Sequence, residues 1–238
     1  MPSPYGLDVI DSCLSCKLRQ FYLFCHLSPD SVKQLEEIKS TVSYPKGAVL
    51  FVAGQQPRGV FILCQGRAKL STSSSDGRTV ILRIAQPGEV LGLSAVVSGR
   101  PCLATAELIE PAQANFIRRA DLLKLLENNG EVALRAAQLL SNQYHSAYET
   151  VHTLGVSHSA TEKLARLLLQ WAAAGKPVED GIRVTVTLKH EEIAQLLGTS
   201  RETVTRLFAK FKSQRLLTLK GSTLIIRDKA ALESLVRG

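Results

Sequence analysis

The chain has 238 residues, of which 45% are hydrophobic and 21% charged, and this composition excludes a largely disordered protein. Lys and Arg outnumber Asp and Glu and give a net charge of +8, which favours a polyanionic partner. Nucleic acid is the first candidate and an anionic membrane surface the second. No apolar run approaches the roughly 20 residues of a membrane helix, and the N-terminus lacks a signal-peptide pattern. We therefore expect a cytoplasmic protein that does not enter the membrane.

The first 27 residues form a cysteine-containing arm. It holds Cys13, Cys16 and Cys25, three of the five cysteines of the chain. A helix start at Ser28 follows, with apolar residues at helical spacing behind it. Because a reducing cytoplasm keeps thiols free, stable disulfides are not expected, and the cysteine spacing points to metal or redox chemistry.

Residues 28–126 carry the pattern of a β-roll or small barrel. Short apolar runs alternate with glycines, among them Gly54, Gly66 and Gly88, as in a series of short strands joined by turns. The clearest predicted strands are residues 49–52, 60–63, 80–82 and 114–117. A polar loop is expected over residues 71–75.

Residues 127–156 are predicted to contain one long dimerisation helix, over 131–154. Its apolar residues recur every seven positions in two columns, which is typical of a coiled-coil seam. The columns are Ala137, Tyr144, Val151 and Leu140, Ala147, Leu154. The alternative is a helix that packs only on its own domain. The small alanines favour close approach of a second helix, so we expect a homodimer.

Residues 157–238 are predicted to form a winged helix-turn-helix domain. The order is a helix over 160–173, a polar link with a turn over 175–184, two more helices, and two short strands around Lys220-Gly221. The expected fold class is therefore α+β, with an N-terminal β-roll of the jelly-roll kind, a long dimerisation helix and a C-terminal winged helix.

The helix-turn-helix itself is predicted over residues 190–211. Gly198 supplies the sharp turn, Ala194 lets the second helix cross the first, and Ser200 caps the second helix. The residues expected to fill the space between the two helices are Ile193, Leu197, Val204 and Leu207. The alternative, a helical hairpin that only packs, does not account for so many positions together.

The exposed side of the second helix has the chemistry of base reading. Arg201 and Arg206 can present a planar donor fork to guanine or phosphate, and Glu202 can accept from the amino group of cytosine. Thr205 lies on the same side, and Ser200 at the start of the helix is a predicted DNA contact as well. Phosphates would repel a carboxylate, so Glu202 favours base reading over generic backbone binding. Lys210 is a predicted phosphate contact, followed by Lys212 and Arg215.

At these residues a family resemblance is plain. The segment GTSRETVTRLFAKF closely resembles the recognition element of the CRP/FNR superfamily, and the domain order matches that family over nearly the whole chain. The resemblance implies a palindromic site with TGTGA-like halves, read by Arg201, Glu202 and Arg206. Arg201 makes this preference CRP-like, whereas Lys189 departs from a capping Thr that the family often has. The expected partners are double-stranded DNA, a second copy of the chain and RNA polymerase.

The segment PGEVLGLSAVVSGRPCLATAEL, residues 87–108, resembles the phosphate-binding cassette of cyclic-nucleotide domains. In nucleotide-binding members a Glu, an Arg and a Ser or Thr hold the ligand, and here those positions are Leu93, Cys102 and Leu103. A buried cyclic phosphate without its cation would be an unpaired charge, so cyclic AMP is not expected as the effector. The residues expected to line an effector pocket are Gly88, Glu89, Arg100 and Cys102.

The cysteine arm resembles the cluster-ligating arm of FNR-type oxygen sensors. A [4Fe–4S] cluster takes four thiolates, and we expect Cys13, Cys16, Cys25 and Cys64. Cys102 is the other choice for the fourth, and the family's own position for it is near Gln113. Zinc bound by the three arm cysteines and one further ligand, a redox-switching dithiol, and an arm with no cofactor remain as alternatives.

Other functions find little support in the sequence. It has no nucleotide-cradling glycine loop before a helix, no nucleophile elbow and no metalloprotease histidine pair, so we expect no enzyme activity. A module that binds only proteins or ligands would not need the base-reading trio. The expected mechanism is allosteric, because a signal at the arm or the β-roll would change packing along the long helix and reorient two winged helices on DNA.

Overall fold

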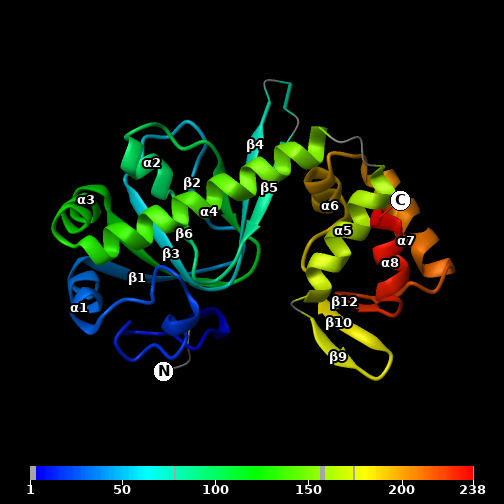
Figure 1. Ribbon diagram of the computed structural model, residues 1–238, viewed down its shortest axis with the longest axis horizontal. Coiled ribbons are helices and arrows are strands. Elements are labelled where there is room, and N and C mark those ends of the chain that lie inside the picture. The colour runs from blue at the N-terminus through cyan, green and yellow to red at the C-terminus, as the bar shows by residue number, and fades with distance from the viewer. Residues whose placement is uncertain (1–3, 75, 78, 156–158, 174, 238) are drawn as a thin grey trace. The chain divides into compact units, whose positions relative to one another are not determined.

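The computed structural model describes residues 4–74, 76–77, 79–155, 159–173 and 175–237 (Figure 1). The chain divides into two compact units, residues 1–149 and 150–238. Among the described residues, no helix combines the length and the apolar character that crossing a bilayer requires. Each unit has its own hydrophobic core and is described by itself.

Helices of the first unit follow the predicted start signals. Two short 3₁₀ turns, Pro4–Gly6 and Arg19–Phe21, lie in the arm. The α1 helix (Pro29–Ile38) begins at Ser28, whose hydroxyl accepts a hydrogen bond from the Ser31 N–H, as an N-cap residue does. The remaining helices are α2 (Leu93–Ser98), α3 (Arg119–Asn128) and α4 (Gly130–Gly155).

Eight strands form the predicted β-roll, as two four-stranded antiparallel sheets. The first sheet has the order β1-β8-β3-β6 and the second β2-β7-β4-β5. The strands are β1 (Lys39–Tyr44), β2 (Val49–Phe51), β3 (Gly59–Gln65), β4 (Ala68–Ser73), β5 (Thr79–Ala85), β6 (Val90–Leu91), β7 (Thr105–Leu108) and β8 (Ala112–Arg118).

The two faces of β3 belong to different cores. Phe61 and Leu63 point into the roll, where they pack with residues of the second sheet. Val60 and Ile62 point the other way, into a core shared with α1, α3 and the first turns of α4. Because side chains alternate along a strand, Cys64 follows Ile62 onto that outer face. This alternation decides which cysteines can meet.

The second unit is a winged helix. The α5 helix (Ala160–Ala173) is followed by α6 (His190–Leu197), α7 (Arg201–Ser213) and α8 (Lys229–Arg237). They pack on a four-stranded sheet of order β11-β12-β10-β9, whose strands are β9 (Lys176–Val178), β10 (Gly181–Thr185), β11 (Leu217–Lys220) and β12 (Thr223–Ile226). The turn from β11 to β12 lies at Gly221, as the sequence predicts.

Two polar segments predicted as irregular are strands. The expected loop over 71–75 is wrong, because β4 continues through Ser71 to Ser73, and Ser75 lies outside the described residues. The expected polar link over 175–184 is the β9-β10 hairpin. Both segments are stabilised by backbone hydrogen bonds to neighbouring strands, and such bonds form whether or not the side chains are apolar. The C-terminal α8 helix has no counterpart in the prediction.

Candidate functional site

The α6-α7 hairpin has the predicted packing. Gly198 ends α6 with φ +64°, a left-handed conformation that glycine adopts without a steric penalty. Ala194 is buried where the helices cross. All four residues predicted to fill the space between the helices are buried: Ile193, Leu197, Val204 and Leu207.

Both helix starts are capped. The Ser200 hydroxyl accepts a hydrogen bond from the Thr203 N–H at 3.2 Å, so α7 begins where the sequence predicts. At α6, the Lys189 N–H donates to the Glu192 carboxylate at 3.0 Å. One of the two hydrogen bonds of a capping box is therefore present although position 189 is Lys and not Thr, and α6 still begins at the expected residue.

The predicted DNA contacts lie on the exposed side of α7. Arg201, Glu202, Thr205, Arg206 and Lys210 are all exposed. The pKa of Glu202 is lowered because the carboxylate accepts hydrogen bonds from its own backbone N–H and from the Ser200 hydroxyl.

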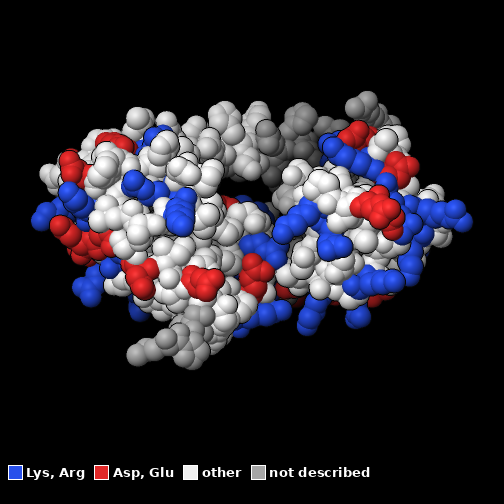
Figure 2. Space-filling model, turned by 90° about the horizontal axis from the view of Figure 1, so that it is seen from below, with Lys and Arg blue, Asp and Glu red and all other residues white. Residues whose placement is uncertain are grey.

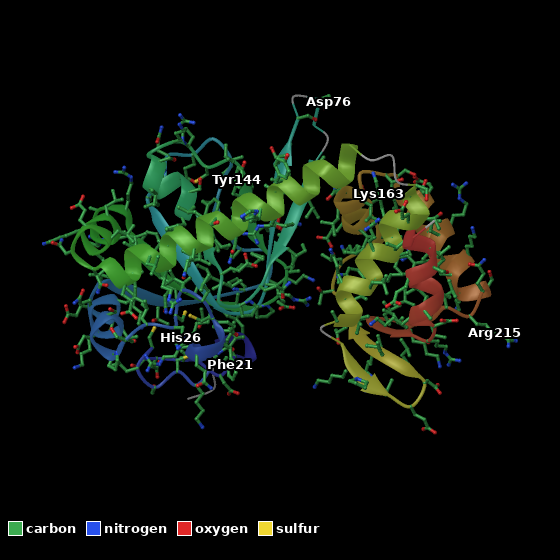
Figure 3. All side chains as sticks on the ribbon, in the orientation of Figure 1. Phe21, His26, Asp76, Tyr144, Lys163 and Arg215 are labelled. Carbon is green, nitrogen blue, oxygen red and sulfur yellow. The ribbon has the colours of Figure 1, made fainter. Side chains whose placement is uncertain are left out.

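The exposed residues of α7 differ in whether they already form hydrogen bonds or ion pairs within the protein. The Thr205 hydroxyl donates to the Arg201 carbonyl at 3.0 Å and lies 3.0 Å from Nδ1 of His190. Arg206 and Lys210 form no ion pair among the described residues and can bind an anion without breaking one. Arg215 lies exposed just after α7 (Figure 3), and Figure 2 shows further Lys and Arg side chains on the surface of this unit.

In the first unit, four cysteines line one cavity of about 30 Å³. They are Cys13, Cys16, Cys25 and Cys64, the predicted set. Most of the remaining lining is apolar, with Val32, Leu35, Ile62 and Leu63 from α1 and β3, and Arg19 and Tyr22 come from the arm. Cys102 does not line this cavity.

Burial controls the ionisation of these thiols. It raises the pKa of Cys13 and Cys25 to about 12 and that of Cys64 to about 11. The Lys39 ammonium acts in the opposite direction on Cys13 and Cys64. Its side chain is 5% exposed and donates to the Thr41 hydroxyl at 2.8 Å. At neutral pH the three buried groups are therefore neutral thiols.

Side-chain amides of β8 hold the arm against the sheet. The buried Gln113 accepts from the Ile10 N–H at 2.8 Å and donates to the Ile10 carbonyl at 2.6 Å. Asn115 lies with its Nδ2 3.5 Å from the Cys13 sulfur and accepts from the Thr41 hydroxyl at 2.8 Å. At the position near which the resemblance would place a ligand, this chain thus has a residue that docks the arm.

The end of the arm is also bonded to α4. The Arg135 Nε donates to the carbonyl of His26, next to Cys25, at 3.2 Å. Glu131 accepts from the Ser28 N–H at 2.9 Å and from the Ser28 hydroxyl at 2.6 Å. Hydrogen bonds from Ser28 and Ser31 lower the pKa of Glu131. The α4 helix is thus bonded to the arm at His26 and to the N-cap of α1 at Ser28.

Among the residues that the structure describes, no three His, Cys, Asp or Glu side chains form a group suited to one metal ion. A single zinc ion would need its sulfurs about 2.3 Å from one centre. A cubane cluster spaces its thiolates more widely, because each sulfur binds a different iron atom.

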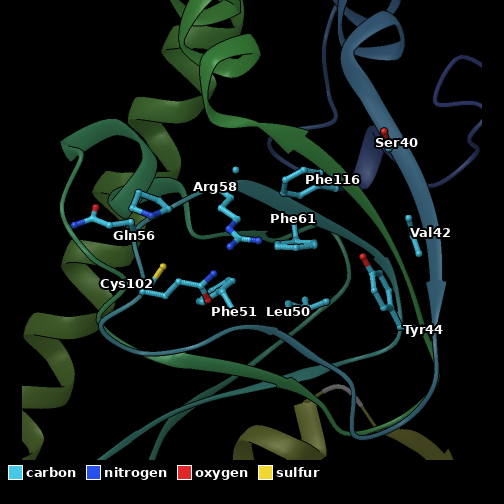
Figure 4. Close-up of a pocket in the computed structure, with 13 residues that line it drawn as sticks. Ser40, Val42, Tyr44, Leu50, Phe51, Gln56, Arg58, Phe61, Cys102 and Phe116 are labelled. Carbon is cyan, nitrogen blue, oxygen red and sulfur yellow. The ribbon is translucent and has the colours of Figure 1, made fainter.

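The predicted effector-pocket residues do not gather at one site. A Cβ on Gly88 would lie 2.3 Å from the Tyr22 ring, so this glycine packs against the arm. Glu89 pairs with Arg83 and accepts from the Gln86 N–H, and Arg100 is exposed. Cys102 lines a cavity of about 370 Å³ between β1, β2 and β3 (Figure 4).

Leu93 and Leu103 stand at cassette positions where nucleotide-binding members have ligand-binding side chains. Leu93 is buried in the core outside the first sheet, and Leu103 is 85% exposed. Neither side chain can donate a hydrogen bond to a sugar or a phosphate.

The α4 helix has an exposed apolar stripe. Leu134, Tyr144 and Tyr148 are 59%, 67% and 66% exposed, and the two tyrosine rings stack with centroids 6.4 Å apart. Of the two predicted columns, Ala137 and Tyr144 are exposed, whereas Leu140 is half-buried on its own domain. Val151 and Leu154 lie outside the residues whose side chains are described.

Several residues of these sites carry no signal in the sequence. Lys39, Glu131 and Arg135 reach the arm from elements far along the chain, and ordinary surface charges have the same appearance in a sequence. Gln113 stands out only as the position where the family resemblance would place a cysteine.

Comparisons with known proteins agree with this architecture. The sequence matches the cyclic nucleotide-binding domain over residues 41–129 and the Crp-like helix-turn-helix domain over residues 162–235. It is 27% identical over 211 residues to the CRP-like cAMP-activated global transcriptional regulator of Mycobacterium tuberculosis, which covers 88% of this chain and 94% of that protein. It is also 27% identical over 222 residues to the transcriptional activatory protein AadR of Rhodopseudomonas palustris, covering 92% and 91%.

Among solved structures, FixK2 from Bradyrhizobium japonicum has a TM-score of 0.73 at 24% sequence identity, covering 83% of this chain and 97% of that one. The predicted fold class is therefore confirmed. Both domain matches fall in the order that the structure shows, one on the roll and one on the winged helix. The chain belongs to the CRP/FNR family of DNA-binding transcription regulators.

Proposed function

We propose that the protein binds palindromic TGTGA-like sites as a homodimer, and that a [4Fe–4S] cluster on the N-terminal arm controls its affinity for DNA. The observation that carries the cluster proposal is the cavity shared by Cys13, Cys16, Cys25 and Cys64. Four cysteine sulfurs are the donor set of such a cluster. The lining of α1 and β3 is apolar, and Arg19 is a cation of the lining that suits a negatively charged group, whereas Lys39 is already paired with Glu36.

The alternatives make different demands on the four cysteines. A dithiol switch needs a thiolate as nucleophile, and burial raises the pKa of Cys13, Cys25 and Cys64. A cluster and a zinc ion also bind thiolates, so loading either one would have to lower these pKa values. If the arm held no cofactor, Cys13 and Cys25 would serve as small apolar residues packed against the core outside the first sheet. The iron, sulfide and zinc content of the protein separates these alternatives.

The chain's own residues suggest how the arm acts. When bound, the cluster supplies an oxygen-sensitive redox centre. The cavity of about 30 Å³ has room for only a few waters, so loading requires the arm to shift. Arg135 and Glu131 connect the end of the arm to the start of α4. We therefore expect the packing of α4, and with it the affinity for DNA, to depend on the state of the arm.

The test begins with protein purified without oxygen. About four iron and four sulfide per chain, with visible absorption that air removes, would support the cluster. Cys64→Ala should lose the iron, the sulfide and the colour, whereas the matched variant Cys102→Ala should keep them. Colourless, metal-free protein would overturn the cluster proposal, and one zinc per chain would favour the zinc alternative instead.

The dimer proposal rests on the exposed stripe of α4. Its members recur at alternating steps of three and four residues, which is the spacing of a helix-helix seam. They are Leu134, Ala137, Ser141, Tyr144 and Tyr148. Large apolar side chains left in water on one helix face suit a second copy of the same helix.

Sedimentation of two variants tests this seam. Tyr144→Glu places a charge in the seam and should give monomers. Asn142→Glu adds the same charge to an exposed residue on another side of α4 and should leave the dimer intact. Dimers in both variants would show that another surface joins the copies.

We further propose that cyclic AMP is not the effector and that RNA polymerase is a partner. Leu93, Cys102 and Leu103 offer no cation or hydroxyl to a cyclic phosphate. Cyclic AMP should therefore leave the DNA dissociation constant unchanged, and a shift of tenfold or more would contradict this. Polymerase contact should be visible as a regulator-dependent change in transcript from a promoter with the proposed site.

A further inference from the structure

The cavity of about 370 Å³ in the β-roll is lined by aromatic rings (Figure 4). Phe61 on β3 lies at the centre of this group. Its ring centroid is 4.9 Å from that of Phe116, 6.3 Å from Phe51 and 6.5 Å from Tyr44. The volume is in the lower part of the range of about 300–1,000 Å³ found for small-molecule pockets. The wall therefore suits a compact apolar body.

The charge in the cavity lining is positive. Among the described residues that line it, Arg58 is the only charged one, and its side chain points into the cavity in Figure 4. It forms no ion pair among the described residues. The Tyr44 hydroxyl also has no hydrogen-bond partner there, and burial raises the pKa of Tyr44, so the hydroxyl remains a donor. Both groups are available to a ligand.

We propose that this cavity binds a small organic acid, with its carboxylate on Arg58 and its apolar body against Phe61. A guanidinium binds a carboxylate through two parallel hydrogen bonds, and the Tyr44 hydroxyl can donate to a polar group on the body of the ligand. An amine would meet the positive charge of Arg58 with no acidic residue in the lining to offset it. The binding is independent of the cysteine arm, so it can be tested whether or not a cluster is present.

The test uses isothermal titration calorimetry on the full chain with 3-phenylpropionate and its uncharged amide. The acid should bind at a single site, and the amide at least tenfold more weakly. Arg58→Gln should weaken the acid about tenfold or more, because a charge-assisted contact is lost. Arg118→Gln is the matched control. Arg118 is also exposed and is the β8 partner of Gly59, the residue next to Arg58, but it does not line the cavity.

A second variant tests the location. Val42→Trp places a large side chain in the cavity mouth, and it should abolish binding of the acid while Arg118→Gln binds as the natural chain does. The proposal is overturned if the natural chain binds no 3-phenylpropionate up to about 10 mM, if acid and amide bind equally, or if Arg58→Gln or Val42→Trp leaves the affinity unchanged.

Discussion

Replacing Arg206 with alanine is expected to remove base reading while leaving the fold intact. The side chain is exposed, so the free energy of unfolding should change by no more than about 0.5 kcal/mol. A bidentate contact between arginine and guanine is worth about 1–3 kcal/mol of discrimination, and a dimer on a palindrome makes it twice. The expected loss is about 2–6 kcal/mol, or roughly 30-fold to 20,000-fold in affinity.

Fluorescence anisotropy on two labelled duplexes measures this loss. One carries two inverted TGTGA half-sites about one helical turn apart, and the other has the same bases shuffled. Lys210→Ala is the matched control, because this exposed cation of the same helix should contact phosphate only. It should weaken both complexes alike and reduce the salt dependence. Equal weakening of both duplexes by Arg206→Ala would refute base reading by Arg206.

Three further changes test the caps and the arm. Ser200→Ala removes the N-cap of α7 and should lower the free energy of unfolding by about 1 kcal/mol in urea titrations; an unchanged value would contradict the cap. Hydrogen bonds from Ser28 lower the pKa of Glu131, so this carboxylate stabilises the fold above about pH 4.5, and that contribution fades as the pH falls through the lowered pKa. Glu131→Gln should therefore be less stable than the natural chain at pH 7, with a difference that shrinks in acid; a constant difference would exclude this role. Gln113→Ala leaves the Ile10 backbone unpaired and should speed proteolysis of the arm, and equal cleavage rates would show that other contacts dock it.

The elements that the sequence predicts well are those in which several local requirements coincide. Gly198 has the left-handed backbone of a tight turn, Ser200 caps α7, and the apolar positions around them are buried. The long α4 helix is similarly favoured by its composition. By contrast, β4 and the β9-β10 hairpin are polar strands stabilised by their neighbours, and no local pattern distinguishes them from loops.

The candidate sites also contain some residues that the sequence predicts and others that it does not. Cys64 lies with Ile62 on the side of β3 that faces the arm, as alternation beyond the predicted strand would suggest, although the pairing with β8 shifts register between Leu63 and Gln65. The expected effector-pocket residues are not seen together in one cavity, because Gly88 and Glu89 belong to a turn whose contacts with the arm and with Arg83 are made only in the folded chain. Arg58 and Tyr44 line the same cavity although they lie far apart in the sequence, and no spacing rule connects them.

The way in which the arm is attached has a consequence for its kinetics. The arm contributes no strand to either sheet among the described residues, and its bonds to β8 run through the side chains of Gln113 and Asn115. Release would leave every strand pairing in place, but it would break these amide contacts and the contact of Arg135 with His26, and it would expose Phe24, which is fully buried in the core outside the first sheet. It should therefore need less free energy than global unfolding, though more than the opening of a surface loop. Amide hydrogen exchange should then separate the two events, with the arm exchanging faster than β3 and β8. A segment that detaches without breaking a strand pairing can reattach without re-forming one, which makes the arm suited to repeated, reversible release.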